Sequence, residues 1–83
     1  MAIKQMYEEQ QNVVNHFLKL IENELPKAFA YIQEETIGAS TGLEYHDELR
    51  GAVREAYRKE LIPKEYKQEV KKLEKAIEYI FTS

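Results

Sequence analysis

The chain has 83 residues, 43% of them hydrophobic and 33% charged, so its composition is that of one folded domain over 1–83 and not of a disordered chain. It has no cysteine, which excludes disulfides, thiolate metal sites and a thiol nucleophile, and no apolar run near the roughly 20 residues that span a bilayer. The net charge of −3 disfavours nucleic acid, which binds strongly basic faces. Because the first nine residues turn acidic where a signal peptide would be apolar, we expect a cytoplasmic protein without membrane attachment.

The first predicted helix covers about 3–37 and contains Pro26. At about 100° per residue, the apolar side chains before Pro26 fall in one wide sector, which is typical of a helix that packs against more than one neighbour. Beyond it, Ala28, Phe29, Tyr31 and Ile32 continue in nearly the same sector. This continuity is what a kink in one long helix would leave, and we expect the helix to be kinked or broken at Pro26; a full turn there would give four helices instead of three.

A tight loop is predicted at Gly38–Gly42. Gly38 stands where a helix end often takes a left-handed residue, and Thr41 with Glu44 matches a capping box that starts the next helix. So short a connection implies antiparallel neighbours.

Two further helices are predicted, over about 43–60 and 63–81. Their apolar faces differ in direction by roughly 100° on a helical wheel, so one continuous helix could not bury both faces against one surface. Pro63 therefore marks a turn at Leu61–Pro63. Together these elements predict an all-α fold, a compact antiparallel bundle of three to four helices.

Basic side chains recur along the outer faces of the last two predicted helices. Arg50, Arg54 and Arg58 follow one another at i, i+4 and i+8, and the second row consists of Lys64, Lys67, Lys71 and Lys75. Such rows bind phosphates or an acidic protein partner. Acidic residues interleaved at i,i+3 and i,i+4 are instead typical of a solvated face. Both interpretations stay open, and the candidate partner-binding residues here are Arg50, Arg54, Arg58, Lys67, Lys71 and Lys75.

Aromatic residues off the centres of the apolar stripes form a second group of candidates. Tyr31, Tyr79 and Phe81 have this placement, and exposed aromatic residues are frequent anchors of protein interfaces. Frayed helix ends also expose such residues without any function. Gly51 points outward from the middle of its helix, where glycine lowers the stability of a helix by about 1 kcal/mol relative to alanine. Either a partner approaches the helix at this position, or the glycine is a neutral residue without a function.

Residues with catalytic or metal-binding spacing are not found in the sequence. His16 and His46 are far apart and lack the neighbours of a zinc or di-metal site, so we expect each to bury its ring and satisfy one nitrogen. The sequence contains no phosphate-binding glycine loop and no nucleophile motif. A bundle this small also has little core volume for a pocket. We therefore predict a protein that is not an enzyme, without catalytic, cofactor or metal sites.

The leading functional hypothesis is a small protein-binding module, a regulator, inhibitor or adaptor that docks a helix face on a protein partner. The alternative is a nucleic-acid-binding helical domain that uses the two basic rows and the turn at Leu61–Ile62 in a helix-turn-helix manner. A homodimer that completes its core across the long first helix is a third hypothesis.

Overall fold

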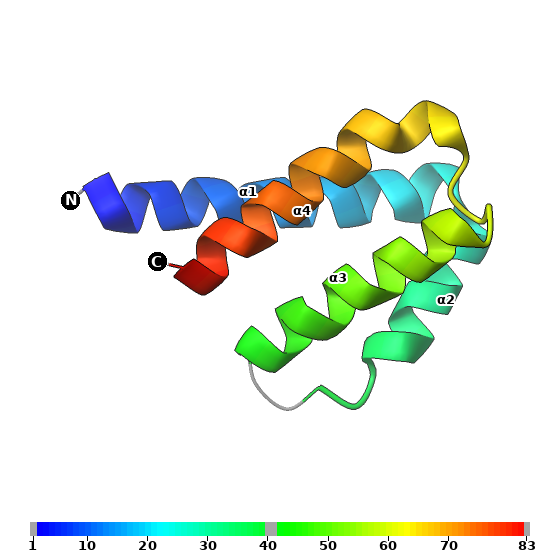
Figure 1. The fold of residues 1–83 in the computed structure, drawn as a ribbon, viewed down its shortest axis with the longest axis horizontal. Helices are drawn as coiled ribbons and strands as arrows, with labels where there is room; N and C mark the ends of the chain where they lie inside the picture. The colour runs from blue at the N-terminus through cyan, green and yellow to red at the C-terminus, as the bar shows by residue number, and fades with distance from the viewer. Residues whose placement is uncertain (1, 40–41, 83) are drawn as a thin grey trace.

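Four α-helices and a short 3₁₀ turn make up most of the computed structural model, which describes residues 2–39 and 42–82, with side chains from Tyr7 onward. The helices are α1 (Ala2–Glu24), α2 (Pro26–Thr36), α3 (Gly42–Arg58) and α4 (Lys67–Thr82), and the turn is η1 (Lys64–Tyr66). α1 packs mainly against α4, and α2 mainly against α3 (Figure 1). The predicted all-α bundle is confirmed.

The core is formed by one apolar stripe from each helix, as the periodicity predicts. Ile62, in the turn before η1, adds a side chain that is fully buried although it lies outside any helix. The buried residues are Val14, Phe17, Ile21, Ala28, Ile32, Leu49, Ala52, Val53, Ala56, Ile62, Val70, Leu73, Ala76, Ile77 and Ile80. All four helices therefore share one core.

Of the two alternatives left open at Pro26, a kink or a break, the structure has the break, and the chain forms two helices there. Leu25 leaves the helical region (φ −134°, ψ 68°), and Pro26 is the first residue of α2. This follows from the proline ring, which disfavours a helical conformation at the preceding residue, and from its missing N–H, which the first helical position does not need. α2 leaves the end of α1 in a new direction (Figure 1). The apolar sector continues because both helices face the same core.

The end of α2 differs from the predicted left-handed cap at Gly38. No glycine in the described residues has a positive φ, and the capping position is Ile37 in a right-handed conformation. The end of α2 is closed in another way: the Ala39 N–H donates to the Thr36 carbonyl oxygen at 3.2 Å, and the Thr36 hydroxyl donates to the carbonyl oxygens of Ile32 at 2.9 Å and Gln33 at 3.3 Å. Thr41 lies outside the described residues, so its capping box with Glu44 stays a prediction.

A left-handed cap does occur, at the end of α3 and on a glutamate. Glu60 has φ 64°, its N–H donates to the Tyr57 carbonyl at 3.1 Å, and the Leu61 N–H donates to the Ala56 carbonyl at 2.9 Å. These two bonds define a Schellman motif, which favours glycine at the left-handed position because a Cβ is strained there. The motif reverses the chain before Pro63 and confirms the predicted turn.

Glu60→Gly should therefore stabilise the protein, by about 0.5–1 kcal/mol, because relief of the left-handed strain exceeds the added entropy of the unfolded chain. Urea denaturation followed by circular dichroism measures this change. Glu60→Ala is the matched control, since it removes the same charge and keeps the strained Cβ. If alanine stabilises as much as glycine, charge and not backbone strain is the cause.

The connection into α4 includes η1, so α4 begins at Lys67 and not at Pro63 as predicted. The Tyr66 hydroxyl donates to the Glu24 carboxylate at 2.7 Å and joins η1 to the end of α1. This hydrogen bond raises the pKa of the Tyr66 phenol above its ordinary value.

Within the described residues, none of the helices has both the length and the apolar character needed to cross a membrane.

Candidate functional site

The seam between α3 and α4 gathers basic residues from both rows predicted as candidates. Arg50 and Arg54 of α3 and Lys71 and Lys75 of α4 line one shallow hollow of about 320 Å³. Glu74 and Glu78 line the same hollow, and the Arg54 Nε donates to Glu74 Oε2 at 2.6 Å. The seam therefore mixes both signs of charge.

Most of the remaining predicted residues are engaged locally. Arg58 forms hydrogen bonds with Glu55, the shortest of 2.6 Å, and these hold the pKa of Glu55 below its ordinary value. Arg50 contacts Asp47 at 3.2 Å and lies 5.5 Å from the centre of the Phe81 ring. Exposed pairs of this kind contribute little to stability because water screens them.

Three predicted residues lie apart from the seam's hollow. Tyr31 of α2 is half-buried, with the Lys59 ammonium 5.0 Å from its ring centre. Tyr79 is half-buried on α4, and Lys67 is exposed at the start of that helix. The structure thus brings four of the nine candidates together in the hollow, places Phe81 against one of them, Arg50, and leaves the other four dispersed.

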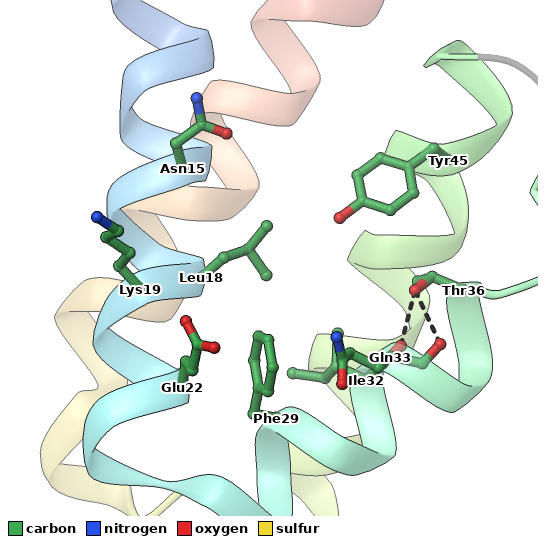
Figure 2. Close-up of a pocket in the computed structure, with 9 residues that line it drawn as sticks. All are labelled: Asn15, Leu18, Lys19, Glu22, Phe29, Ile32, Gln33, Thr36 and Tyr45. Atoms are coloured by element: carbon green, nitrogen blue, oxygen red, sulfur yellow. Dashed lines mark hydrogen bonds between the residues drawn. The ribbon is translucent and has the colours of Figure 1, made fainter.

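A second and more apolar hollow opens between α1, α2 and α3, where the sequence predicted little room for a pocket. It measures about 380 Å³, within the usual range of ligand sites. In Figure 2, Leu18 of α1 and Phe29 of α2 extend into the space, and Tyr45 of α3 directs its hydroxyl toward them. The lining residues are Asn15, Leu18, Lys19, Glu22, Phe29, Ile32, Gln33, Thr36 and Tyr45. We call this hollow the groove.

The groove exists because of the break at Leu25. α1 packs on α4 while α2 turns away to pack on α3, so α1 and α2 diverge and the wedge between them is not filled. Leu18, Phe29 and Tyr45 pack against the core on one side and remain half-exposed on the other. An open apolar surface of this kind is typical of a binding site.

The groove continues past Thr36 into a neighbouring hollow. Gln33, Thr36 and Tyr45 line both hollows, and Glu34 and Ile37 complete the second. Ile37 is 86% exposed, an unusual state for isoleucine. Together the two hollows form an elongated surface along α2.

The lining of the groove also includes polar groups, and two of them have defined states. The Thr36 hydroxyl is bonded to its own helix and does not serve the groove. Burial raises the pKa of the Tyr45 phenol, so this hydroxyl stays protonated at neutral pH. Among the described residues, neither Glu22 nor Glu34 makes an ion pair. The carboxylates of the groove are therefore free to meet a ligand.

The histidines lie in different surroundings. His46 is buried, as predicted, and its Nδ1 donates to the Gly42 carbonyl at 2.6 Å, while Nε2 is buried without a partner among the described residues. His16 is exposed, so the prediction of a buried ring is wrong there. No cluster of three or more metal-ligating side chains occurs within residues 2–39 and 42–82.

Gly51 faces solvent in the middle of α3. A Cβ built there would meet no atom within 4 Å, so packing inside this chain does not require glycine. The two interpretations given for it, a partner's approach or a neutral residue, both remain predictions.

Sequence reasoning missed the groove because its walls have the pattern of a core. Leu18, Phe29 and Tyr45 fall in the predicted apolar stripes, and periodicity does not separate a buried position from a half-open one. One signal was available in the sequence, the proline inside the apolar run. If the helix breaks at that proline, the aromatic residues before and after the break cannot all pack against the same neighbouring helix.

Comparisons with models of protein families, with curated proteins and with solved structures give no match to this chain. Function is therefore inferred from the residues and their geometry.

Proposed function

We propose that this protein is a small non-enzymatic protein-binding module, a regulator, inhibitor or adaptor, that takes a large apolar side chain of a protein partner into the groove. The observation that supports this most is the groove itself, with its apolar walls from three helices. Its volume suits a large side chain, and its extension toward Ile37 suits the neighbouring residues of a partner segment. The free carboxylates of Glu22 and Glu34 suit a segment with basic residues.

The test uses two exposed glutamines that differ only in position. Gln33→Trp places a large ring at the groove, whereas Gln68→Trp places the same ring on the outer side of α4. A partner isolated from the native host and then purified should bind Gln33→Trp at least about tenfold more weakly than the unmodified protein. It should bind Gln68→Trp without change. Equal binding of both variants would exclude the groove as the docking site.

Nucleic-acid binding is the second candidate function, and the observation that favours it is the gathering of Arg50, Arg54, Lys71 and Lys75 at the α3–α4 seam. The carboxylates of Glu74 and Glu78 in the same hollow oppose it, because they repel phosphates. Fluorescence anisotropy with a labelled DNA duplex at low salt separates the candidates. Affinity that falls steeply with added salt and is lost in Arg54→Glu would favour nucleic acid.

A further inference from the structure

The Phe29 end of the groove combines an aromatic ring, apolar side chains and a carboxylate. Glu22 and Leu18 of α1 and Phe29 of α2 line the same hollow, and in Figure 2 the Glu22 carboxylate is directed to the side of α1 on which Leu18 and Phe29 lie. Lys19 also belongs to the lining of the hollow, at its rim, and in Figure 2 its ammonium points away from Phe29. Of these two charged side chains, Glu22 is therefore the one directed toward the Phe29 side, and a ligand placed there would meet apolar surface along its body and a carboxylate at its tip.

Aromatic faces attract cations because the ring quadrupole is negative above its plane. Two rings of this protein already have such contacts, Phe81 with Arg50 and Tyr31 with Lys59. Among the described residues, Phe29 and Tyr45 have no cation over their rings. These two rings line the groove and are open to an external cation.

We propose that this end of the groove recognises a cationic side chain, arginine or lysine, of the partner segment. Its apolar stem lies on Leu18 and Phe29, and its charged tip pairs with Glu22 next to the Phe29 ring. An arginine or lysine fits this surface because its long stem is apolar and only the tip is charged. The inference rests on the proposed function, since it gives the chemistry of the partner that the groove accepts.

The test compares three small probes that share a phenylethyl body and differ in charge: 2-phenylethylammonium, 2-phenylethanol and 3-phenylpropionate. Each is titrated into ¹⁵N- and methyl-labelled protein and followed by NMR. We expect the cation to shift the signals of Leu18, Phe29 and Tyr45 and to bind about three- to tenfold more tightly than the neutral alcohol. The anion should bind most weakly.

Variants identify the carboxylate responsible. Glu22→Gln should remove the preference for the cation over the alcohol, because the carboxylate is lost while the apolar walls remain. Glu8→Gln, an exposed glutamate elsewhere on α1, is the matched control and should retain the preference. Lys19→Gln should increase the affinity for the cation, because it removes a like charge from the rim.

The outcomes separate this inference from the proposed function. Equal binding of cation and alcohol at the groove would overturn the cation site and leave a protein-binding groove in place. Absence of groove shifts with every probe would also overturn it. The Gln33→Trp experiment tests the proposed function independently of both results.

Discussion

Leu73→Ala should destabilise the protein by about 2–5 kcal/mol, the range for a large-to-small change in a packed core. Leu73 is fully buried on α4, the helix that packs mainly against α1. A domain of this size has a free energy of unfolding of only about 4–12 kcal/mol, so one cavity removes a large share of it. Urea and thermal denaturation followed by circular dichroism should show a melting temperature lower by about 8 °C or more.

Lys72→Ala is the matched control, because Lys72 is the neighbouring residue on α4 and is exposed. Its unfolding free energy should stay within about 0.5 kcal/mol of the unmodified protein. Similar losses in both variants would mean that α4 does not bury the predicted stripe, and the packing of α1 on α4 would have to be revised.

Phe29→Ala should weaken partner binding by about 30- to 1000-fold, the effect of truncating a central interface residue. Phe29 lines the groove from α2, and its truncation removes the largest apolar wall that a partner side chain would contact. It should also lower stability by about 1–3 kcal/mol, since the ring packs partly against the core. Isothermal titration calorimetry with the purified partner measures the affinity, and urea denaturation measures the stability.

Tyr57→Ala separates the two effects. Tyr57 is another half-buried aromatic residue that packs against the core, and it does not line the groove. Its loss of stability should be similar to that of Phe29→Ala, while the affinity for the partner should be unchanged. If both variants lose affinity equally, the loss reports general destabilisation and the groove is not the binding surface.

Local sequence signals predicted the helices and their buried faces because both depend on neighbouring residues. The 3.6-residue period identified the stripes containing Phe17, Leu49 and Ile77, which are all buried. The rotation of the apolar face across Pro63 predicted a turn that the Schellman motif provides. These features depend on helix geometry and proline sterics, which a single sequence contains.

The choice left open at Pro26 and the wrong prediction of a left-handed cap at Gly38 have separate physical causes. A helical wheel measures rotation about an axis and not the direction of that axis, so it could not show that α2 departs from α1 at Leu25. A glycine permits a left-handed conformation without requiring it. The end of α2 is closed without one, since the Ala39 N–H donates to the Thr36 carbonyl oxygen, whereas Glu60 adopts one despite its Cβ.

The candidate sites depended more than the helices did on how the helices pack against one another. The arginine and lysine rows were visible on separate helices, but their meeting at the seam follows from the antiparallel packing of α3 on α4 (Figure 1). The groove requires the relative directions of three helices, and no residue pattern specifies those directions. Leu18, Phe29 and Tyr45 therefore appeared as core residues until the structure showed them half-open.

Site-specific photo-crosslinking in the native host tests the central claim, that a partner docks in the groove, most directly. Photoreactive p-benzoylphenylalanine replaces Ile37, exposed where the groove continues, or Gln68 on the outer side of α4 as control. The account predicts that Ile37 and not Gln68 crosslinks, and that mass spectrometry places the adduct in a partner segment with a large apolar residue and an arginine or lysine within one helical turn. Crosslinks from Gln68 and none from Ile37 would contradict it.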